Sequence, residues 1–84
     1  MKTTPYFEQK LLDRPEIRRE WCEQVVASPI KSMIQPNGRL SLWGVIPEYG
    51  DRVLRVITLE DRETLHNAYF DRNFRSRLLR GLEP

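Results

Sequence analysis

The feature that most constrains the fold is a change of hydrophobic period near Ile30. Before it, apolar residues recur every three or four positions, as on one side of a helix. After it, apolar and polar residues alternate as they do in half-buried strands. Turn signals follow about every dozen residues, at 37–38, at 47–51 and at 61–62. This order predicts an α+β fold in which two N-terminal helices pack on a four-stranded antiparallel meander.

Two helical stripes precede the strands. The first helix has an apolar side that consists of Tyr6, Phe7, Leu11 and Leu12. Pro15 interrupts this pattern, and Asp13 stands where it would cap a second helix that ends near Ser28. The apolar stripe of that second helix consists of Ile17, Trp21, Val25 and Val26. Both stripes are expected to face the sheet.

The Asn37-Gly38 pair predicts a two-residue hairpin turn of type I′, because both residues tolerate the positive φ that this turn requires. Such a turn sets Ile34 opposite Ser41. A register has a large consequence in a sheet, since a slip of one residue turns every side chain to the other face.

The later registers decide where the charged residues lie. We expect Gly44 opposite Arg55 and Ile57 opposite His66. The face toward the helices would then hold Ile30, Ile34, Trp43, Val45, Leu54, Val56, Leu65 and Tyr69. Arg55 and His66, with Lys31 and Gln35, would share the other face with a set of apolar residues, namely Met33, Leu40, Leu42, Ile46, Val53, Ile57, Leu59 and Phe70. Such a mixed face is expected to be only partly covered, by a C-terminal helix or by a partner chain.

Length and composition restrict the class of protein. A chain of 84 residues builds one core, so residues 1–84 are expected to form a single domain. No apolar run approaches the roughly 20 residues that cross a bilayer, and we expect a cytoplasmic protein without a membrane segment. With one Cys and one His, the chain lacks the ligands of a disulfide framework or a structural metal site. No nucleotide-binding glycine motif is present, so no cofactor is expected.

The net charge of +2 is small, but its distribution is uneven. Arg72, Arg75, Arg77 and Arg80 follow one another with no acid between them, in a segment that Asp71 is placed to cap as a helix. These arginines are candidates for binding a nucleic-acid backbone. The alternative is that they form a solvated helix surface.

Two further residues are candidates for catalysis. His66 is the one side chain that titrates near neutral pH, so it could transfer protons; alternatively it is hydrogen-bonded locally and inert. Arg55 stands where the strand alternation expects an apolar residue. It could bind a phosphate or stabilise developing negative charge, or it could form an ion pair with Glu60, Asp71 or a helix carboxylate.

The order of two short helices, the stretch "QPNGRLSLWGVIPEYGDRVLRVITLEDRETLHNAYFDR" and a basic C-terminal helix resembles small bacterial domains related to BrnT-type toxins. More distantly it resembles the RelE/ParE toxin superfamily, chiefly through "RVLRV" and "LHNAYFDR". The resemblance implies metal-independent cleavage of RNA, or its loss, with RNA or the ribosome as target and an antitoxin that covers the active face. Arg55, His66 and the arginines from Arg72 onward would be the functional residues.

A rival interpretation is a non-catalytic module that docks a protein partner on its partly apolar sheet face. A third is a small protein with a purely structural role. The sequence is compatible with a monomer or a small homo-oligomer.

Overall fold

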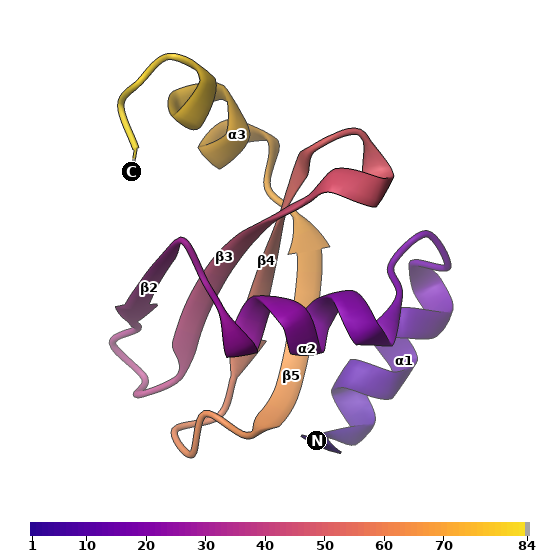
Figure 1. Cartoon of the computed structure of the whole chain (residues 1–84). Helices are drawn as coiled ribbons and strands as arrows, with labels where there is room; N and C mark the ends of the chain where they lie inside the picture. The colour runs from indigo at the N-terminus through magenta and orange to yellow at the C-terminus, as the bar shows by residue number, and fades with distance from the viewer. Residues whose placement is uncertain (84) are drawn as a thin grey trace.

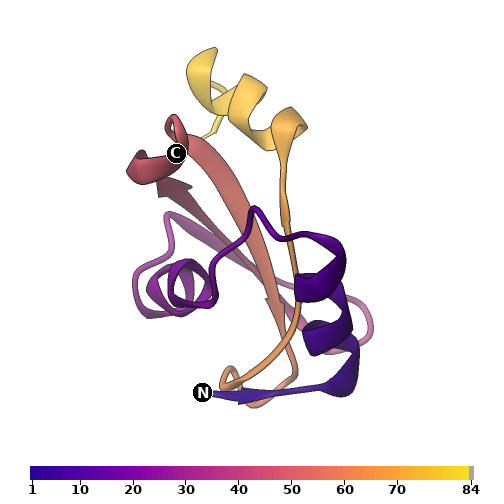
Figure 2. The same ribbon diagram turned by 90° about the vertical axis from the view of Figure 1, so that its right-hand side faces the viewer.

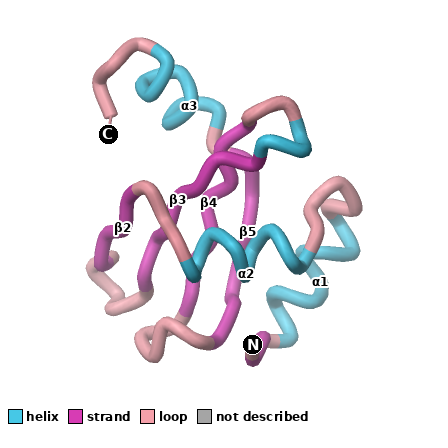
Figure 3. The backbone as a smooth tube through the Cα atoms, viewed as in Figure 1, coloured by secondary structure: helices cyan, strands magenta, loops and turns pink. Residues whose placement is uncertain are grey.

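A five-stranded mixed sheet forms the centre of the molecule, and the computed structural model describes residues 1–83 (Figure 1). Along the chain the elements are β1 (Lys2–Thr3), α1 (Pro5–Asp13), α2 (Arg19–Ala27), β2 (Lys31–Ile34), β3 (Leu40–Ile46), the 3₁₀ helix η1 (Pro47–Tyr49), β4 (Arg52–Thr58), β5 (Thr64–Phe70) and α3 (Arg72–Leu79). α2 crosses the sheet, α1 lies beside β5, and α3 lies at one end of the strands (Figure 3). Among the described residues, no helix combines the length and apolar character that a membrane span requires.

The strand order is β1-β5-β4-β3-β2, with β1 parallel to β5 and every other pair antiparallel. The predicted α+β class is therefore confirmed, and β2, β3, β4 and β5 form the predicted antiparallel meander, but the prediction of a four-stranded, wholly antiparallel sheet is wrong, because the sheet has five strands and is mixed. The first strand was not predicted, because two residues are too few to show a period. Its parallel pairing to β5 continues into the hydrogen bond from Thr4 N to Leu65 O, at 3.0 Å.

The helix ends follow local capping rules with one exception. Thr4 Oγ1 accepts a hydrogen bond from Phe7 N and caps α1. The prediction that Asp13 caps the second helix is wrong, because Asp13 is the last residue of α1. α2 begins only after Arg18, whose side chain forms no cap. The chain needs residues 14–18 to turn from α1, beside β5, to α2, which crosses the sheet (Figures 1 and 2).

The Asn37-Gly38 hairpin is real, but its turn type differs from the predicted one. Gly38 has a φ of +87°, whereas Asn37 is not in the left-handed region, so a type I′ turn is excluded. Gln35 N donates to Arg39 O at 2.7 Å, which closes a loop of three residues instead of two. Consequently Ile34 pairs with Leu40, and the predicted pairing with Ser41 is wrong by one position.

The two later registers differ from prediction by one position as well. Trp43 pairs with Arg55, so the expected pairing of Gly44 with Arg55 is wrong. Between β4 and β5, Ile57 pairs with Asn67 and Thr58 pairs with Leu65. His66 is the extra residue of this β-bulge and lies opposite no single partner.

The corrected registers exchange the two faces for several side chains. The main core lies between the sheet and the helices and contains Phe7, Ile17, Trp21, Cys22, Val25, Leu40, Leu42, Ile46, Leu54, Val56, Leu65 and Ala68. Trp43 and Val45, which were predicted to face the helices, belong instead to a second cluster with Val53, Phe74 and Leu78. Gly44 faces α2, where a Cβ would approach Val25 Cγ2 to 2.8 Å. The absence of a side chain at this position lets the helix lie close to the sheet.

Candidate nucleic-acid interface

The sheet face opposite α2, hereafter the open face, has Arg55 at its centre. The guanidinium carbon of Arg55 lies 4.9 Å from the ring centroid of Trp43 and 5.6 Å from that of Tyr69. Its Nε and Nη2 donate to Ser41 Oγ at 3.2 and 2.8 Å. No carboxylate in the described part of the chain forms an ion pair with it, so the ion pair considered from sequence is not formed there. A half-buried guanidinium held by two rings and a hydroxyl keeps donors for an anion.

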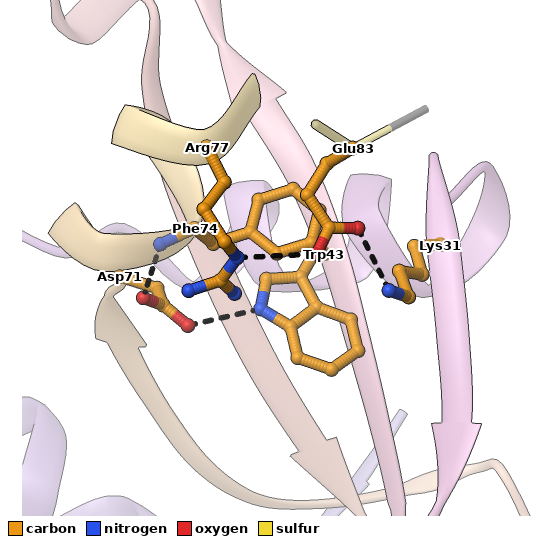
Figure 4. Close-up of polar contacts among 6 residues, drawn as sticks. All are labelled: Lys31, Trp43, Asp71, Phe74, Arg77 and Glu83. Atoms are coloured by element: carbon orange, nitrogen blue, oxygen red, sulfur yellow. Dashed lines mark hydrogen bonds and ion pairs between the residues drawn. The ribbon is translucent and has the colours of Figure 1, made fainter. Parts of the chain in front are cut away.

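One end of the open face is covered by α3, which Trp43 and Asp71 hold in place (Figure 4). Trp43 Nε1 donates to Asp71 Oδ2 at 3.0 Å, and Phe74 N donates to Asp71 Oδ1 at 2.9 Å. The rings of Trp43 and Phe74 stack with centroids 5.2 Å apart. Asp71 thus caps α3, as the sequence predicted, and also ties the helix to β3.

The charge state of Asp71 follows from these contacts. Burial disfavours its charged form, but hydrogen bonds from Phe74 N and Trp43 Nε1 and the charges of Arg55 and Arg77 outweigh burial and lower the pKa of Asp71. Both of its oxygens already accept hydrogen bonds within the protein. Asp71 therefore serves the fold, and it keeps its negative charge, because hydrogen bonds from neutral donors do not cancel it.

A groove opens where β5 ends, between the α1–α2 connection, η1 and the start of α3. It consists of two adjoining pockets of about 230 and about 580 Å³ that share Arg52, Phe70 and Arg72. We call it the arginine groove, defined by Arg14, Arg52, Arg72 and Arg75 together with Tyr49, Tyr69 and Phe70. The carboxylates that also line it are Asp71, which is engaged internally, and Glu16, which is exposed.

The arginines of the groove come from three parts of the chain: Arg14 follows α1, Arg52 begins β4, and Arg72 and Arg75 lie in α3. Arg14, after α1, donates to Asn67 Oδ1 at 3.0 Å and to Ala68 O at 2.7 Å, which fixes it to β5. The guanidinium of Arg52 lies over the ring of Tyr49, 5.1 Å from its centroid. Arg75 is oriented by bonds to the carbonyl oxygens of residues 50 and 51, at 3.3 and 3.2 Å. None of these contacts neutralises the positive charge.

The four C-terminal arginines do not form one patch. Arg72 and Arg75 line the groove, whereas Arg77 turns to the other side and donates to Glu83 Oε1 at 3.2 Å. Glu83 also accepts from Lys31 Nζ at 2.7 Å (Figure 4). The hydrogen bond from Lys31 lowers the pKa of Glu83, and the hydrogen bond from Arg77 adds to this effect, whereas burial acts in the opposite direction. The net result is a pKa below the ordinary value of a glutamate, so Glu83 is charged at neutral pH. Arg80 is exposed at the end of α3 and lines none of the pockets described.

His66 lies at a separate place, beside the start of α1. Its Nδ1 is 3.0 Å from Thr4 Oγ1, and its ring stacks on Tyr6 with centroids 4.9 Å apart. Burial, with a smaller contribution from the charge of Arg39, lowers the pKa of His66, so the ring is neutral at pH 7. These contacts match the alternative in which His66 is held by local interactions.

Arg55 and His66 do not meet. Arg55 pairs with Tyr69, three residues along β5 from His66, which separates the two backbones by roughly 10 Å at the usual rise of a strand. No hydrogen bond joins them, and the pocket beside His66 is not lined by Arg55. The two side chains are therefore not in contact, and one phosphate would have to bridge them for both to act on it.

Other reactive groups are also accounted for. Cys22 is fully buried among the helix residues, and burial raises the pKa of its thiol to about 12, so it is a core residue. Within residues 1–83, no three His, Cys, Asp or Glu side chains are grouped in a way that could hold a metal ion.

Several residues of the interface were missed by the sequence analysis. Trp43 and Tyr69 were assigned to the helix-facing side, and the register error is the cause. Arg14 and Arg52 stand alone in the sequence and gave no cluster signal. The one available signal for Arg52 was its position directly after a turn, at a strand end, where side chains of different strands converge.

Comparison of the chain with protein-family models, with curated proteins and with solved structures finds no match. The functional proposal below therefore rests on the contacts and charges described above.

Proposed function

We propose that this chain is a toxin-like RNA-binding domain that holds single-stranded RNA, free or in the ribosome, along the arginine groove and the adjoining open face. The observation that supports it most strongly is the convergence of Arg14, Arg52, Arg72 and Arg75 on one groove. In the described part of the chain, none of the four is paired with a carboxylate. Guanidinium groups bind phosphate through paired N–H donors, so four of them suit a phosphate backbone.

The aromatic residues favour a nucleic-acid strand over a small anion. The rings of Tyr49 and Phe70 stack at 5.0 Å, and Tyr69 lies beside both Arg14 and Arg55. Groups of this kind offer surfaces on which bases stack, while the arginines track the backbone. A single phosphate would occupy only a small part of two adjoining pockets.

Binding comes before cleavage in this proposal. Metal-independent RNA cleavage needs a proton acceptor and a cationic group at one phosphate, and His66 and Arg55 are not in contact with each other. Cleavage by these two residues would require the bound strand to bring one phosphate between Arg55, which would stabilise its charge, and His66, which would accept the proton of the attacking 2′-hydroxyl as the 5′-oxygen leaves. Purified protein incubated with RNA, with His66→Ala and Arg55→Ala as comparisons, tests for cleavage.

The salt dependence of RNA binding tests the groove. Fluorescence anisotropy with a labelled oligoribonucleotide should give a logarithmic plot of affinity against salt with a negative slope, because bound cations are released from each phosphate. Arg52→Ala and Arg72→Ala should each make that slope shallower by about 0.7. Arg80→Ala removes the same charge from the same helix outside the groove and should leave the slope nearly unchanged. Equal effects of all three substitutions would contradict a localised groove.

A specific observation also favours a protein-interaction role. Among the strands of residues 1–83, β2 pairs with β3 alone, so no strand lies along its outer edge, and Ile30, Met33 and Ile34 are exposed there. An extended peptide could add to this edge as a further strand. RNA binding that survives Ile34→Lys but is weakened in Arg52→Ala and in Arg72→Ala would support the first proposal. No RNA binding at low salt, with a strand peptide captured at β2, would support the second.

A further inference from the structure

A small pocket near His66 has a chemistry different from that of the arginine groove. It measures about 290 Å³ and lies between the start of α1, the β2–β3 hairpin and the bulge of β5. We call it the amide pocket; its polar and aromatic lining consists of Tyr6, Gln35, Asn37, Arg39, His66 and Asn67. Figure 2 shows the hairpin and the first turns of α1 at the same side of the molecule. The volume is at the low end of ligand sites, which suits one small ring.

Three carboxamides line this pocket, and their existing bonds define what each has left to offer. Asn67 Oδ1 accepts from Arg14 Nη1 and from Ala68 N, so its amide nitrogen remains as a donor. Asn37 Oδ1 accepts from Arg39 N, which leaves its amide nitrogen as well. Together they present donors that converge with the charge of Arg39.

Gln35 supplies a hydrogen-bond acceptor, in contrast to the donors of the two asparagines. Its Oε1 is shielded from solvent and has no hydrogen-bond partner among the described residues. A buried acceptor without a partner is costly, and a rotation of the carboxamide toward a ligand donor would relieve that cost. The pocket thus combines donors with an acceptor, which matches a planar heterocycle and does not match a bare anion or a hydrocarbon.

The wall of the pocket is aromatic. The rings of Tyr6 and His66 stack on each other at 19°, Lys10 Nζ lies 5.1 Å from the Tyr6 ring centroid, and Tyr6 is 46% exposed, so a base would extend this stack at its solvent side. RNA-binding proteins hold an unpaired base by stacking it on such rings and by bonding its edges to amide groups. The bond from Arg14 to Asn67 connects the pocket to the groove, since Arg14 lines the groove and Asn67 lines the pocket.

We propose that the amide pocket receives one unpaired nucleobase, whose edges are read by Gln35, Asn37 and Asn67 and whose ring stacks beside Tyr6 and His66. The proposal rests on the proposed function insofar as the base belongs to an RNA strand whose phosphates lie on Arg14 and Arg39. The amide pocket would then select among bases, and the arginine groove would supply affinity for any RNA strand.

Nuclear magnetic resonance of the 10.0 kDa protein tests the pocket separately from RNA binding. Nucleoside monophosphates are titrated against ribose 5-phosphate, and the side-chain amide signals of Gln35, Asn37 and Asn67 are followed. At least one nucleotide should shift these signals, whereas ribose 5-phosphate should leave them in place. Equal shifts with the sugar phosphate, or no shifts with any nucleotide, would overturn the proposal even if RNA binds the groove.

Oligoribonucleotides of one repeated base extend the test to a strand. The wild type should discriminate between the best and worst base by roughly tenfold, and Gln35→Ala and Tyr6→Ala should reduce that ratio while keeping the salt slope. Arg52→Ala should weaken all strands alike. A thermal melt confirms that each variant is folded. If no strand binds the wild type at low salt, the proposed RNA function fails, while the nucleotide titration still decides the pocket.

Discussion

The two faces of one sheet differ sharply, although the same strands form both. On the face toward the helices, Leu42, Leu54, Val56 and Leu65 are completely shielded from solvent. On the open face, the corresponding central residue of β4 is Arg55, held by Trp43 and Tyr69 and only half-buried. The comparison teaches that one well-packed face is sufficient to build the core, which leaves the other free to carry charge and amide groups.

The open face is not uncovered along its whole length, because α3 packs on one end of it. This helix covers one end of the open face with the small cluster of Trp43, Val53 and Phe74, while the rest of that face stays open. The cluster is anchored by Asp71 and not by a long apolar surface. The stability of α3 should therefore depend on a few polar bonds, in contrast to that of the helices on the other face.

The largest loss of stability is expected from a substitution on the face that the helices cover. Leu54→Ala removes a fully buried side chain and should lower the free energy of unfolding by about 2–5 kcal/mol. The melting temperature should fall by roughly 10 °C or more for a chain of this size. Leu12→Ala is the matched control, because Leu12 is 76% exposed, and should change stability by less than about 0.5 kcal/mol. Similar losses for both variants would show that the core is not where the contacts place it.

Asp71→Ala should have the next largest effect, at about 1–2 kcal/mol at pH 7, because it removes both the α3 cap and the acceptor of Trp43. The folded pKa of Asp71 lies below its ordinary value of 3.8. The carboxylate therefore stabilises the folded state above that value, and this contribution is lost as the pH falls through the lower folded pKa. Urea unfolding curves should show wild type and variant converging in acid.

Asp13→Ala is the control for that experiment, since Asp13 is at the exposed end of α1 and bonds only to Gln9 among the described residues. It should change neither the stability at pH 7 nor its decline in acid by more than a few tenths of a kcal/mol. A difference between wild type and Asp71→Ala that stays constant from pH 7 to pH 2 would contradict the role of the charged carboxylate.

The smallest effect on stability is expected on the open face. Arg55→Met removes a half-buried cation that has no carboxylate partner among the described residues, but it also removes both donors to the buried Ser41 hydroxyl, so the free energy of unfolding should fall by about 1 kcal/mol. RNA binding should nevertheless weaken, with a salt slope shallower by about 0.7. Chemical denaturation and anisotropy together measure the two quantities. A loss of stability comparable to that of Leu54→Ala would erase the distinction between the faces.

The parts of the fold that could be predicted are those set by local chemistry. The cap at Asp71 was predicted, because a side chain needs only the next three residues to bond their backbone. The cap at Asp13 was not borne out, since the path from α1 to α2 depends on where both helices pack. β1 escaped prediction because its pairing partner is more than 60 residues away and the strand itself has two residues.

The candidate site was predicted in part for the same reason. Arg55 was singled out because a charge breaks the alternation of its own strand, and Arg72 and Arg75 because they follow one another closely. Arg14 and Arg52 join them only when three distant segments meet at the end of β5. Arg77 does not line the groove, because it forms an ion pair with Glu83 in the segment that follows α3.

By itself, the sequence determined the class of the fold, the approximate extent of the helices and the antiparallel meander, because these depend on period, turn residues and composition. Only the tertiary structure decided the registers. The sequence pattern allows a two-residue or a three-residue turn at Asn37-Gly38, and packing selects the latter. That one-residue difference moves Trp43 to the side of Arg55, and so it decides which face forms the core and which can bind.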